Sequence, residues 1–241
     1  MSYSIIIPVH NEVESLPTLL DRLKPYSQNN EIIIIDDGSN DQSGSLLQQC
    51  SFITLIHFPN NFGKGKAIRA GLEKSSNDKI ILFDGDLELD LHELTNFMIL
   101  NKVEGIDVVF GSRVNSMNPL GSIIDFGNFF LNGLFNLIHQ TNFSDVLCGC
   151  KAFYKSDLSF ELTNSVGFDI DVEIASNLVS INNSINEIIS RKCKHSHISI
   201  HNYKHNKIMS KTEKTEIREH LNNCNEHNLG TSITYFMPRI D

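Results

Sequence analysis

The residues best suited to chemistry form an acidic run, DGDLE at 84–88, that directly follows an apolar stretch. Its three carboxylates stand at alternate positions, so an extended backbone would project them from one face. Oxygen ligands of this kind suit a hard divalent cation, which can neutralise the charge that develops on a diphosphate leaving group. Asp84, Asp86 and Glu88 are therefore candidate ligands of a divalent cation. The alternative is a solvated acidic turn before a helix that begins after Asp90.

A second acidic run, DDGSND at 36–41, also follows an apolar stretch. Gly38 permits a tight turn, and the carboxylates can accept hydrogen bonds from the hydroxyls of a ribose or from a base. The alternative is a turn in which Ser39 or Asp41 caps the next helix, and the two roles are compatible.

The segment NNFGKGKA at 60–67 places glycines and lysines at the entrance of a predicted helix. Such an entrance suits the approach of a phosphate or a nucleotide. The segment is not a P-loop, because the GxxxxGK[ST] spacing is absent. The alternative is an ordinary helix start.

Two cationic residues lie beside predicted sheet ends, Arg113 in GSR and Lys151 in CGCK. Either could contact a diphosphate or a phosphorylated acceptor. The alternative for each is a structural ion pair with Asp145 or Asp107.

Three more carboxylates, Asp169, Asp171 and Glu173, repeat at a spacing of two within GFDIDVEI. In a helix Asp169 and Glu173 would share a face, and in a strand all three would. One of them could act as a general base or orient an acceptor. N-capping and simple exposure are the competing interpretations.

Two further patterns carry less chemical content. Cys193, His195 and His197 alternate, but closed zinc sites usually draw their ligands from spaced loops, so we favour a polar strand edge. The Phe-rich stretch 126–138 is interpreted as core, with a membrane-facing stripe as the alternative. The residues of that stripe would be Phe129, Phe130, Leu134 and Phe135.

The elements that must position these residues follow a βαβ rhythm. The first 110 residues alternate β-branched runs with amphipathic stretches, which predicts a mainly parallel sheet flanked by helices. Strands are expected at 3–8, 31–36, 52–58, 79–83, 107–110, 148–154 and 185–190. Helices are expected at 12–24, 41–50, 64–75, 90–102, 121–139 and 170–180. Because ligands bind outside the carboxyl ends of such strands, four polar loops are expected to converge on one edge.

The chain has 241 residues and a formal net charge of −9, enough for one large α/β domain with a polar appendage. We predict a domain at 1–200 and a polar tail or helical appendage at 201–241. Net negative charge argues against nucleic-acid binding. The five scattered cysteines indicate reduced thiols, and neither a membrane span nor a leader is evident. We expect a cytoplasmic protein, with peripheral contact at the cytoplasmic face of the membrane as an option.

Taken in order, seven segments resemble the family 2 glycosyltransferases: IIIPVHNE, IIIDDGSND, NNFGKGKAIRAG, DGDLELD, GSR, DVLCGCKAF and GFDIDVEI. The resemblance covers roughly residues 4 to 190. Within the family the chain is most similar to the polyprenyl-phosphate hexosyltransferases, the group that includes dolichol-phosphate mannose synthase. The resemblance implies a GT-A fold, which is a Rossmann-like, mainly parallel sheet.

The resemblance also implies roles for particular residues. Asp84, Asp86 and Glu88 would hold Mg²⁺ or Mn²⁺ against the diphosphate. Arg113 would face the phosphates, and Lys151 would dock the acceptor. The implied catalytic residues are Asp86, Arg113, Asp171 and Glu173. The implied donor-binding residues are Pro8, Asn11, Glu12, Asp37, Gly38, Ser39, Asn61, Gly63, Lys64, Asp84 and Gly85.

The implied reaction is an inverting transfer of a hexose from a UDP- or GDP-sugar to a polyprenyl phosphate. A phosphate acceptor is already an anion, so it needs no strong general base. If the acceptor is instead a hydroxyl of a glycan or glycolipid, Asp171 or Glu173 must act as base. Noncatalytic nucleotide-sugar binding is a third hypothesis. A sugar nucleotidyltransferase ranks last, because its Gly-rich signature near the first strand is missing.

Overall fold

The computed structural model describes residues 2–87, 89–113, 123–158, 167, 169–181, 184–190, 197–204 and 232–233. The strands are β1 (Ser4–Val9), β2 (Glu31–Asp36), β3 (Thr54–His57), β4 (Lys79–Leu82), β5 (Val108–Arg113), β6 (Lys151–Tyr154), β7 (Ser184–Ser190), β8 (His197–Lys204) and β9 (Ser232–Ile233). The α-helices are α1 (Leu16–Leu23), α2 (Ser43–Gln48), α3 (Lys64–Lys74), α4 (Leu94–Phe97), α5 (Ile123–His139) and α6 (Ile170–Ile181). Short 3₁₀ turns are η1 (Lys24–Gln28), η2 (Leu91–Glu93) and η3 (Lys155–Asp157).

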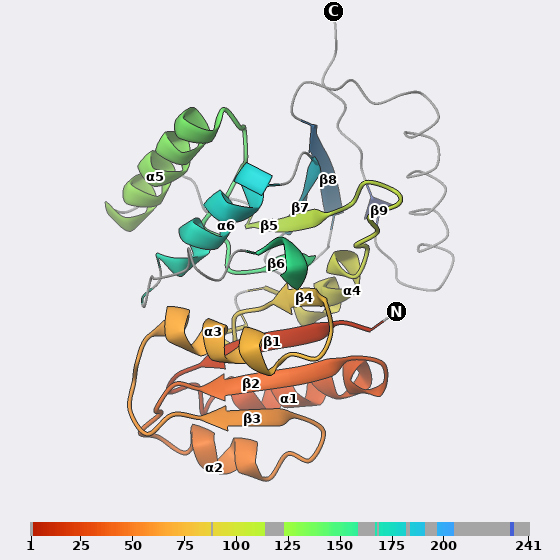
Figure 1. Cartoon of the computed structure of the whole chain (residues 1–241). Coiled ribbons are helices and arrows are strands. Elements are labelled where there is room, and N and C mark those ends of the chain that lie inside the picture. Colours follow the sequence, from red (N-terminus) through yellow and green to blue (C-terminus); the bar gives the residue numbers. More distant parts are fainter. Residues whose placement is uncertain are drawn as a thin grey trace, which may run out of the picture.

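One sheet with the strand order β3-β2-β1-β4-β6-β5-β7-β8-β9 forms the centre of the molecule. The strands β3, β2, β1 and β4 are parallel, and β6 runs antiparallel to both β4 and β5. The isoleucine runs at 5–7 and 32–35 are buried on both faces of the sheet, as parallel strands covered by helices require. The arrowheads of β1, β2 and β3 point to the same edge in Figure 1. The predicted fold class is confirmed.

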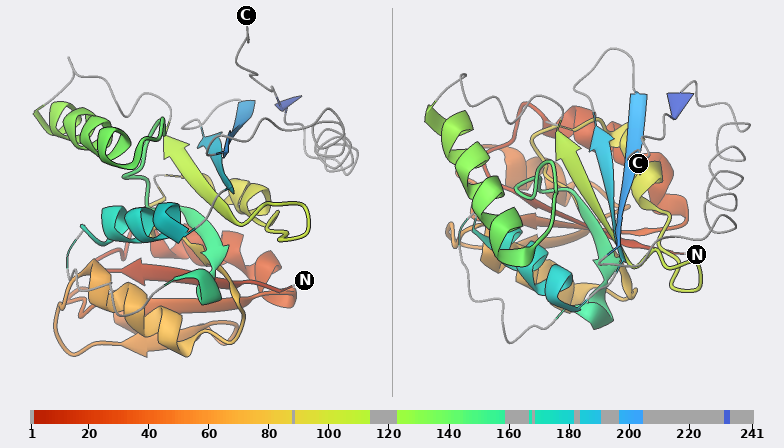
Figure 2. Two further views of the ribbon diagram at one scale, coloured as in Figure 1. Left: turned by 45° about the horizontal axis from the view of Figure 1, so that its top comes forward. Right: turned by 90° about the horizontal axis from the view of Figure 1, so that it is seen from above.

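Helices cover both faces of this sheet, so the molecule has three layers (Figure 1, Figure 2). On one face Leu19 of α1, Leu47 of α2 and Leu94 of α4 belong to the buried cluster that contains Ile5 and Ile7 of β1. On the other face Ile68 of α3 and Ile174 of α6 belong to the buried cluster that contains Ile6 of β1. This arrangement leaves the carboxyl ends of β1, β2 and β4 open at one edge.

Two predicted boundaries need correction. Gly111, Ser112 and Arg113 are the last residues of β5 rather than a loop after it, because β5 keeps pairing with β7 as far as Arg113 and Ser190. The helix expected at 90–102 is much shorter, since η2 and α4 end at Phe97. The chain then turns through 101–106, where the ends form an isolated antiparallel bridge.

The sheet continues across the domain boundary predicted at residue 200. The strand β8 pairs antiparallel with β7, from Ser184 opposite Lys204 to Ile189 opposite Ser199, so residues on both sides of 200 belong to the sheet. The division into a domain and an appendage stays a prediction. Most of the appendage predicted at 201–241 lies outside the described residues, namely 205–231 and 234–241, and so do Cys193 and His195. No helix in the described ranges is long and apolar enough to cross a bilayer.

Candidate active site

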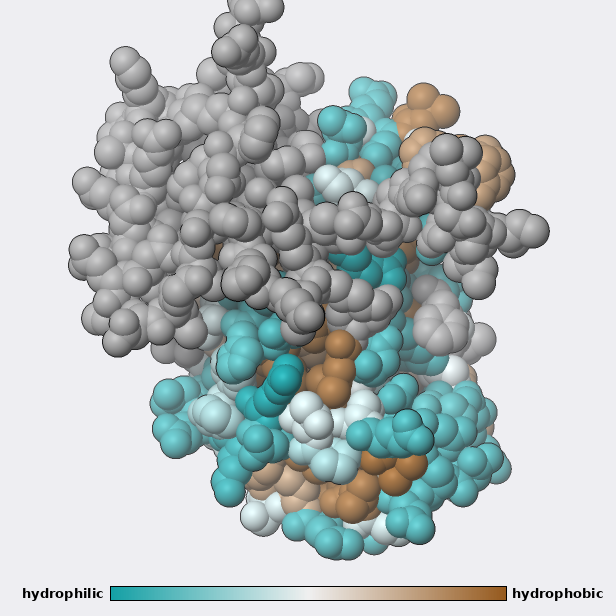
Figure 3. Space-filling model, turned by 180° about the vertical axis from the view of Figure 1, so that it is seen from behind, coloured by the Kyte–Doolittle hydropathy of each residue, from teal (hydrophilic) through white to brown (hydrophobic). Residues whose placement is uncertain are grey.

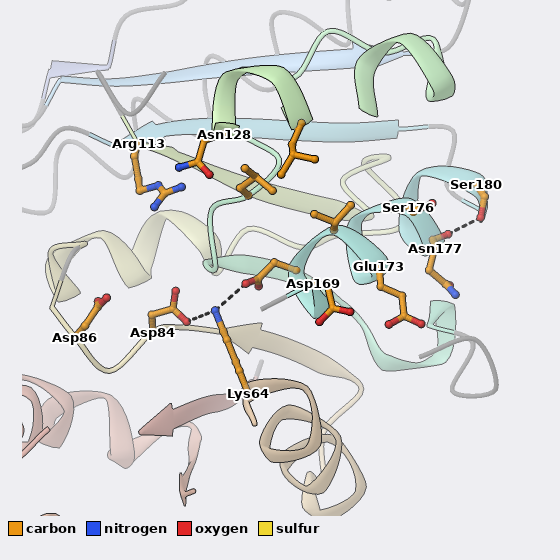
Figure 4. Close-up of a pocket in the computed structure, with 14 residues that line it drawn as sticks. Lys64, Asp84, Asp86, Arg113, Asn128, Asp169, Glu173, Ser176, Asn177 and Ser180 are labelled. Carbon is orange, nitrogen blue, oxygen red and sulfur yellow. Dashed lines mark hydrogen bonds and ion pairs between the residues drawn. The ribbon is translucent and has the colours of Figure 1, made fainter. Parts of the chain in front are cut away.

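A cavity of about 960 Å³ opens at the edge where the strands end (Figure 4). It gathers side chains from the start of α3, the loop after β4, the end of β5, and the facing helices α5 and α6. Its lining comprises Lys64, Asp84, Asp86, Arg113, Asn128, Leu131, Leu147, Asp169, Asp171, Val172, Glu173, Ser176, Asn177 and Ser180. Charged residues predicted separately from four parts of the sequence therefore meet in one place.

The acidic run after β4 reaches the cavity through a turn, not through the extended geometry that we expected. The strand ends at Leu82, residues 85 and 86 form a turn, and Leu87 has a positive φ of 58°. Asp84 is partly buried and Asp86 is exposed, yet both line the cavity. Glu88 lies outside the described residues, so its role as a metal ligand stays a prediction.

Lys64 links this turn to α6. Its ammonium nitrogen Nζ lies 2.7 Å from Asp84 Oδ1 and 2.8 Å from Asp171 Oδ2 (Figure 4). Burial alone lowers the pKa of Lys64, but the two carboxylates outweigh it and raise the pKa above its ordinary value. Lys64 is therefore a fixed cation in the cavity, where the sequence had indicated a residue that approaches a phosphate.

Lys151 is fully buried behind Asp171. Its Nζ donates a hydrogen bond to the Cys148 carbonyl oxygen and lies 3.8 Å from Asp171 Oδ1. That carboxylate oxygen has no hydrogen-bond partner in the described part of the chain. Because Lys151 is not among the described residues that line the cavity, its geometry favours support of Asp171. Direct contact with an acceptor phosphate stays a prediction.

Arg113 lines the cavity and also forms the ion pair with Asp145 that was one of its two interpretations, whereas its contact with a phosphate stays a prediction. Its Nε donates to Asp145 Oδ2 at 2.8 Å, and its Nη2 donates to Asp145 Oδ1 at 3.3 Å. Asp145, fully enclosed, was one of the two partners foreseen. The pair aims the guanidinium group at the cavity rather than leaving it to rotate.

The loop that carries Asp145 is held from below by Glu187 of β7, a residue that the sequence analysis missed. The Glu187 carboxylate accepts hydrogen bonds from the backbone N–H of Ser144 at 2.8 Å, from its hydroxyl at 2.9 Å, and from the Asp145 N–H at 3.2 Å. Burial raises the pKa of Glu187, although these hydrogen bonds oppose the rise. A glutamate among the isoleucines of the strand segment SINEIIS was the available signal.

All three carboxylates of GFDIDVEI line the cavity. Asp169 precedes α6, and its carbonyl oxygen accepts the N–H of Val172 and Glu173. The same helix adds a polar wall that we did not predict, formed by Ser176, Asn177 and Ser180 (Figure 4). Their spacing after Glu173 is helical, so periodicity analysis of this segment could have found them.

The loops after β1 and β2 are tied to one another and to the loop before α3. Both oxygens of Asp37 accept backbone hydrogen bonds, from Phe62 at 2.7 Å and from Gly63 at 2.9 Å. Gly38 has a φ of 67°, and a Cβ there would lie 2.2 Å from the carbonyl carbon of Asn60. Glycine is therefore required where these two loops touch.

Asn11 completes this arrangement in a left-handed conformation with a φ of 57°. Its N–H donates to Ser39 Oγ at 2.9 Å, and its Oδ1 accepts from Asn40 N at 2.9 Å. Most residues predicted to bind the donor are not in the described lining of the cavity, so their contact with a nucleoside stays a prediction. They are Pro8, Asn11, Glu12, Asp37, Gly38, Ser39, Asn61, Gly63 and Gly85.

The carboxylate oxygens of Asp84 and Asp86 fit a hard divalent cation that takes further ligands from phosphate oxygens and water. Asp84 and Asp86 present carboxylate oxygens to one cavity, and Mg²⁺ is commonly bound by one or two carboxylates plus substrate phosphates. Within the described ranges no group of three or more His, Cys, Asp or Glu side chains forms a complete metal cage. A cation here would therefore depend on the ligand for its remaining coordination.

Comparisons with known proteins agree with this picture. The model for "Glycosyl transferase family 2" matches residues 4–160. An undecaprenyl-phosphate 4-deoxy-4-formamido-L-arabinose transferase of Yersinia pestis is 41% identical over 126 residues, which cover 48% of this chain and 38% of that protein. The chain thus aligns with well under half of the length of this curated relative.

Solved structures with low sequence identity share the fold. The crystal structure of glucosyl-3-phosphoglycerate synthase of Mycobacterium tuberculosis superimposes with a TM-score of 0.60 at 16% identity, covering 93% of this chain and 81% of that one. The same enzyme in complex with Mn²⁺, uridine diphosphate and glucosyl-3-phosphoglycerate gives a TM-score of 0.58 at 16% identity, covering 93% and 80%.

Proposed function

Because the chain belongs to glycosyl transferase family 2, we propose that it transfers a hexose from a UDP- or GDP-sugar to a polyprenyl phosphate with the help of Mg²⁺ or Mn²⁺. One observation carries this proposal. A single cavity joins the two carboxylates after β4, the cations Lys64 and Arg113, and three carboxylates on α6. These are the charges needed to hold a nucleotide diphosphate and to place an acceptor against it.

The end of the cavity near β4 and β5 suits the diphosphate. A divalent cation bound at Asp84 and Asp86 would stabilise the negative charge of the leaving diphosphate. Arg113 presents N–H donors that its ion pair with Asp145 keeps in place, and such preorganised donors stabilise developing charge at little reorganisation cost. This arrangement supports one direct displacement with inversion at the anomeric carbon.

The acceptor is proposed to be a lipid phosphate because α5 presents an unusual apolar surface beside the cavity. Leu131 is half-exposed and lines the cavity itself, so the apolar face continues into the site. Figure 3 shows apolar surface at the end of the molecule where α5 lies. Seven large side chains of α5 are exposed: Phe126, Phe129, Phe130, Leu131, Leu134, Leu137 and Ile138. Phe135 is the exception to the stripe considered from sequence, since it is buried against Phe143.

Amphipathic helices with such faces lie in the boundary between headgroups and acyl chains. A phosphate that belongs to a membrane lipid would then enter the cavity from the side of α5. The undecaprenyl-phosphate transferase among the relatives supports the same acceptor class. Peripheral membrane contact through α5 is part of the proposal.

A second acceptor class, a hydroxyl of a glycan or glycolipid, is favoured by one feature. Asp171 lines the cavity with one carboxylate oxygen that lacks a hydrogen-bond partner in the described ranges. A hydroxyl acceptor needs a base to take its proton, and a carboxylate in this position is suited to that role.

The test is transfer of radiolabelled sugar from UDP-glucose and GDP-mannose, with Mn²⁺, to a polyprenyl phosphate or to the matching polyprenol in detergent. We expect product with the phosphate, none with the alcohol, and dependence on the metal. Asp171→Asn should reduce phosphate-dependent transfer only severalfold. Transfer to the polyprenol with near-complete loss in the Asp171→Asn variant would establish the hydroxyl reaction instead. Donor binding without transfer to any acceptor would refute the proposed activity.

A further inference from the structure

Lys64 joins three parts of the chain that are far apart in sequence. It is the first residue of α3, and it contacts Asp84 of the turn after β4 and Asp171 in the first turn of α6. The lysine side chain is only 11% exposed, and that of Asp171 only 6%. A single ammonium group therefore bridges a carboxylate on the metal side of the cavity and one on the acceptor side.

We propose that Lys64 is a positioning residue that occupies Asp84 until a nucleotide diphosphate draws it away, so that the metal binds tightly only together with the donor. The inference rests on the proposed function and deepens it by assigning to Lys64 the coupling between metal binding and nucleotide binding.

The first step is competition for one oxygen atom. Lys64 Nζ lies 2.7 Å from Asp84 Oδ1, so a divalent cation coordinated by that oxygen would meet a like charge in direct contact. The metal alone is therefore expected to bind weakly. A nucleotide diphosphate changes this balance because its oxygens offer Lys64 a new anionic partner and offer the metal further ligands.

The second step concerns which side chain moves. Asp84 is pressed against the backbone of Gly149, where a Cβ would lie only 1.9 Å from Asp84 Oδ2. The aspartate is therefore confined. Lysine carries its charge on a flexible four-carbon stem, so Lys64 can shift toward the cavity while Asp84 stays in place.

The third step is what remains at Asp171. When Lys64 leaves, Asp171 Oδ2 loses its partner at 2.8 Å, but Lys151 stays 3.8 Å from Oδ1. The buried carboxylate thus keeps one nearby cation, so Lys64 can move without leaving Asp171 uncompensated.

The experiment measures free Mn²⁺ by electron paramagnetic resonance while the full chain is titrated, with and without UDP. It compares the wild type with Lys64→Met, Lys64→Gln and Lys64→Arg. The matched control is Lys102→Met, which removes another lysine paired with an aspartate, Asp157, at 2.8 Å but away from the cavity. Circular dichroism melts establish that each variant is folded.

We expect the wild type to bind Mn²⁺ weakly alone and much more tightly with UDP. Lys64→Met and Lys64→Gln should bind Mn²⁺ alone about tenfold more tightly, since a contacting like charge is gone, and should lose most of the enhancement by UDP. Lys64→Arg and Lys102→Met should resemble the wild type.

Unchanged or weaker Mn²⁺ binding in both neutral variants, with normal enhancement by UDP, would overturn the inference and leave the proposed function intact. A wild type that binds neither Mn²⁺ nor UDP would instead overturn the proposed function, and the inference with it. If only one neutral variant folds, its Mn²⁺ affinity decides the question.

Discussion

The two sides of the cavity are built differently. On the proposed donor side, the loops after β1 and β2 satisfy their carboxylates and amides with backbone groups of neighbouring loops, as Asp37 and Asn11 do. On the proposed acceptor side, Asn132 and Asn136 tie α5 to the loop that follows it, and most of the large apolar residues of α5 are exposed. The loops of the proposed donor side are therefore held in place by hydrogen bonds, whereas the proposed acceptor side presents an exposed apolar surface.

The contacts that do hold α5 lead back to the cavity. Asn132 donates to the Phe143 carbonyl oxygen and accepts from the Val146 N–H, each at 2.9 Å. These bonds fix the loop that carries Asp145, the partner of Arg113. The helix α5 thus also supports Arg113, the residue expected to face the phosphates, through the loop that carries Asp145.

The largest effect is expected on the rigid side, at Asp84. Asp84→Asn removes the charge that would hold the metal and should lower the transfer rate about 100-fold, as loss of a main electrostatic contact does. The measurement is the steady-state rate with Mn²⁺. Asp157→Asn, which breaks only the surface pair with Lys102, should retain wild-type activity. Equal rates for Asp84→Asn and the wild type would show that the donor side is not the metal side.

The next effect is a loss of folding stability when Glu187, which holds the loop that carries Asp145, is replaced. Glu187→Ala leaves the three donors of Ser144 and Asp145 without their acceptor and should lower the free energy of unfolding by about 3 kcal/mol. Urea unfolding measures the change. Glu187→Gln keeps an acceptor oxygen and should cost less.

The same residue gives a pH dependence with a definite sign. Burial raises the pKa of Glu187 in the folded protein, so the folded state holds its proton more tightly than the unfolded state does. Its contribution is most favourable below the unfolded pKa and declines as the pH rises from about 4.5 toward the folded pKa. Glu187→Gln should therefore gain stability relative to the wild type over that range. A constant difference would mean that Glu187 is not perturbed.

A smaller difference is expected between two glycine-to-alanine substitutions, one beside Asp84 and one in α5. Gly149→Ala would place a Cβ 1.9 Å from Asp84 Oδ2, so the carboxylate must shift and activity should fall about tenfold. Gly133→Ala in α5 meets nothing within 4 Å and should leave activity unchanged while stabilising the helix by about 0.5 to 1 kcal/mol. Kinetics and thermal melts distinguish the two. Equal activities of the Gly149→Ala and Gly133→Ala variants would contradict the inference that close packing around Asp84 matters for activity.

The smallest effect is expected where α5 meets α6. The His139 ring nitrogen Nε2 lies 2.9 Å from Ser176 Oγ, and burial lowers the pKa of His139. The neutral ring is favoured in the folded state, so this contribution is present above about pH 6.5 and is lost as the pH falls through the folded pKa. Amide hydrogen exchange in α5 should accelerate slightly on acidification, and His139→Asn should remove that change. Exchange that is insensitive to pH would show that this contact does not anchor the helix.

Much of the donor side could be predicted from sequence because its signals are local. Isoleucine runs identify buried parallel strands, and glycine and carboxylate clusters mark the turns that follow them, so Asp84, Asp86 and Arg113 were correctly expected near one sheet edge. The alternation argument for the acidic run was wrong, because the chain turns at residue 85 and enters a left-handed conformation at Leu87.

By itself, the sequence determined the fold class, the family and the charged residues that gather at the sheet edge, since apolar periodicity and ordered motifs are properties of short segments. Only the tertiary structure decided which charge meets which. Lys64 pairs with Asp171, 107 positions away, Lys151 lies behind the cavity wall, and Glu187 supports a loop from another strand. The physical reason is that partners of buried charges are chosen by packing between distant elements, which local patterns do not encode.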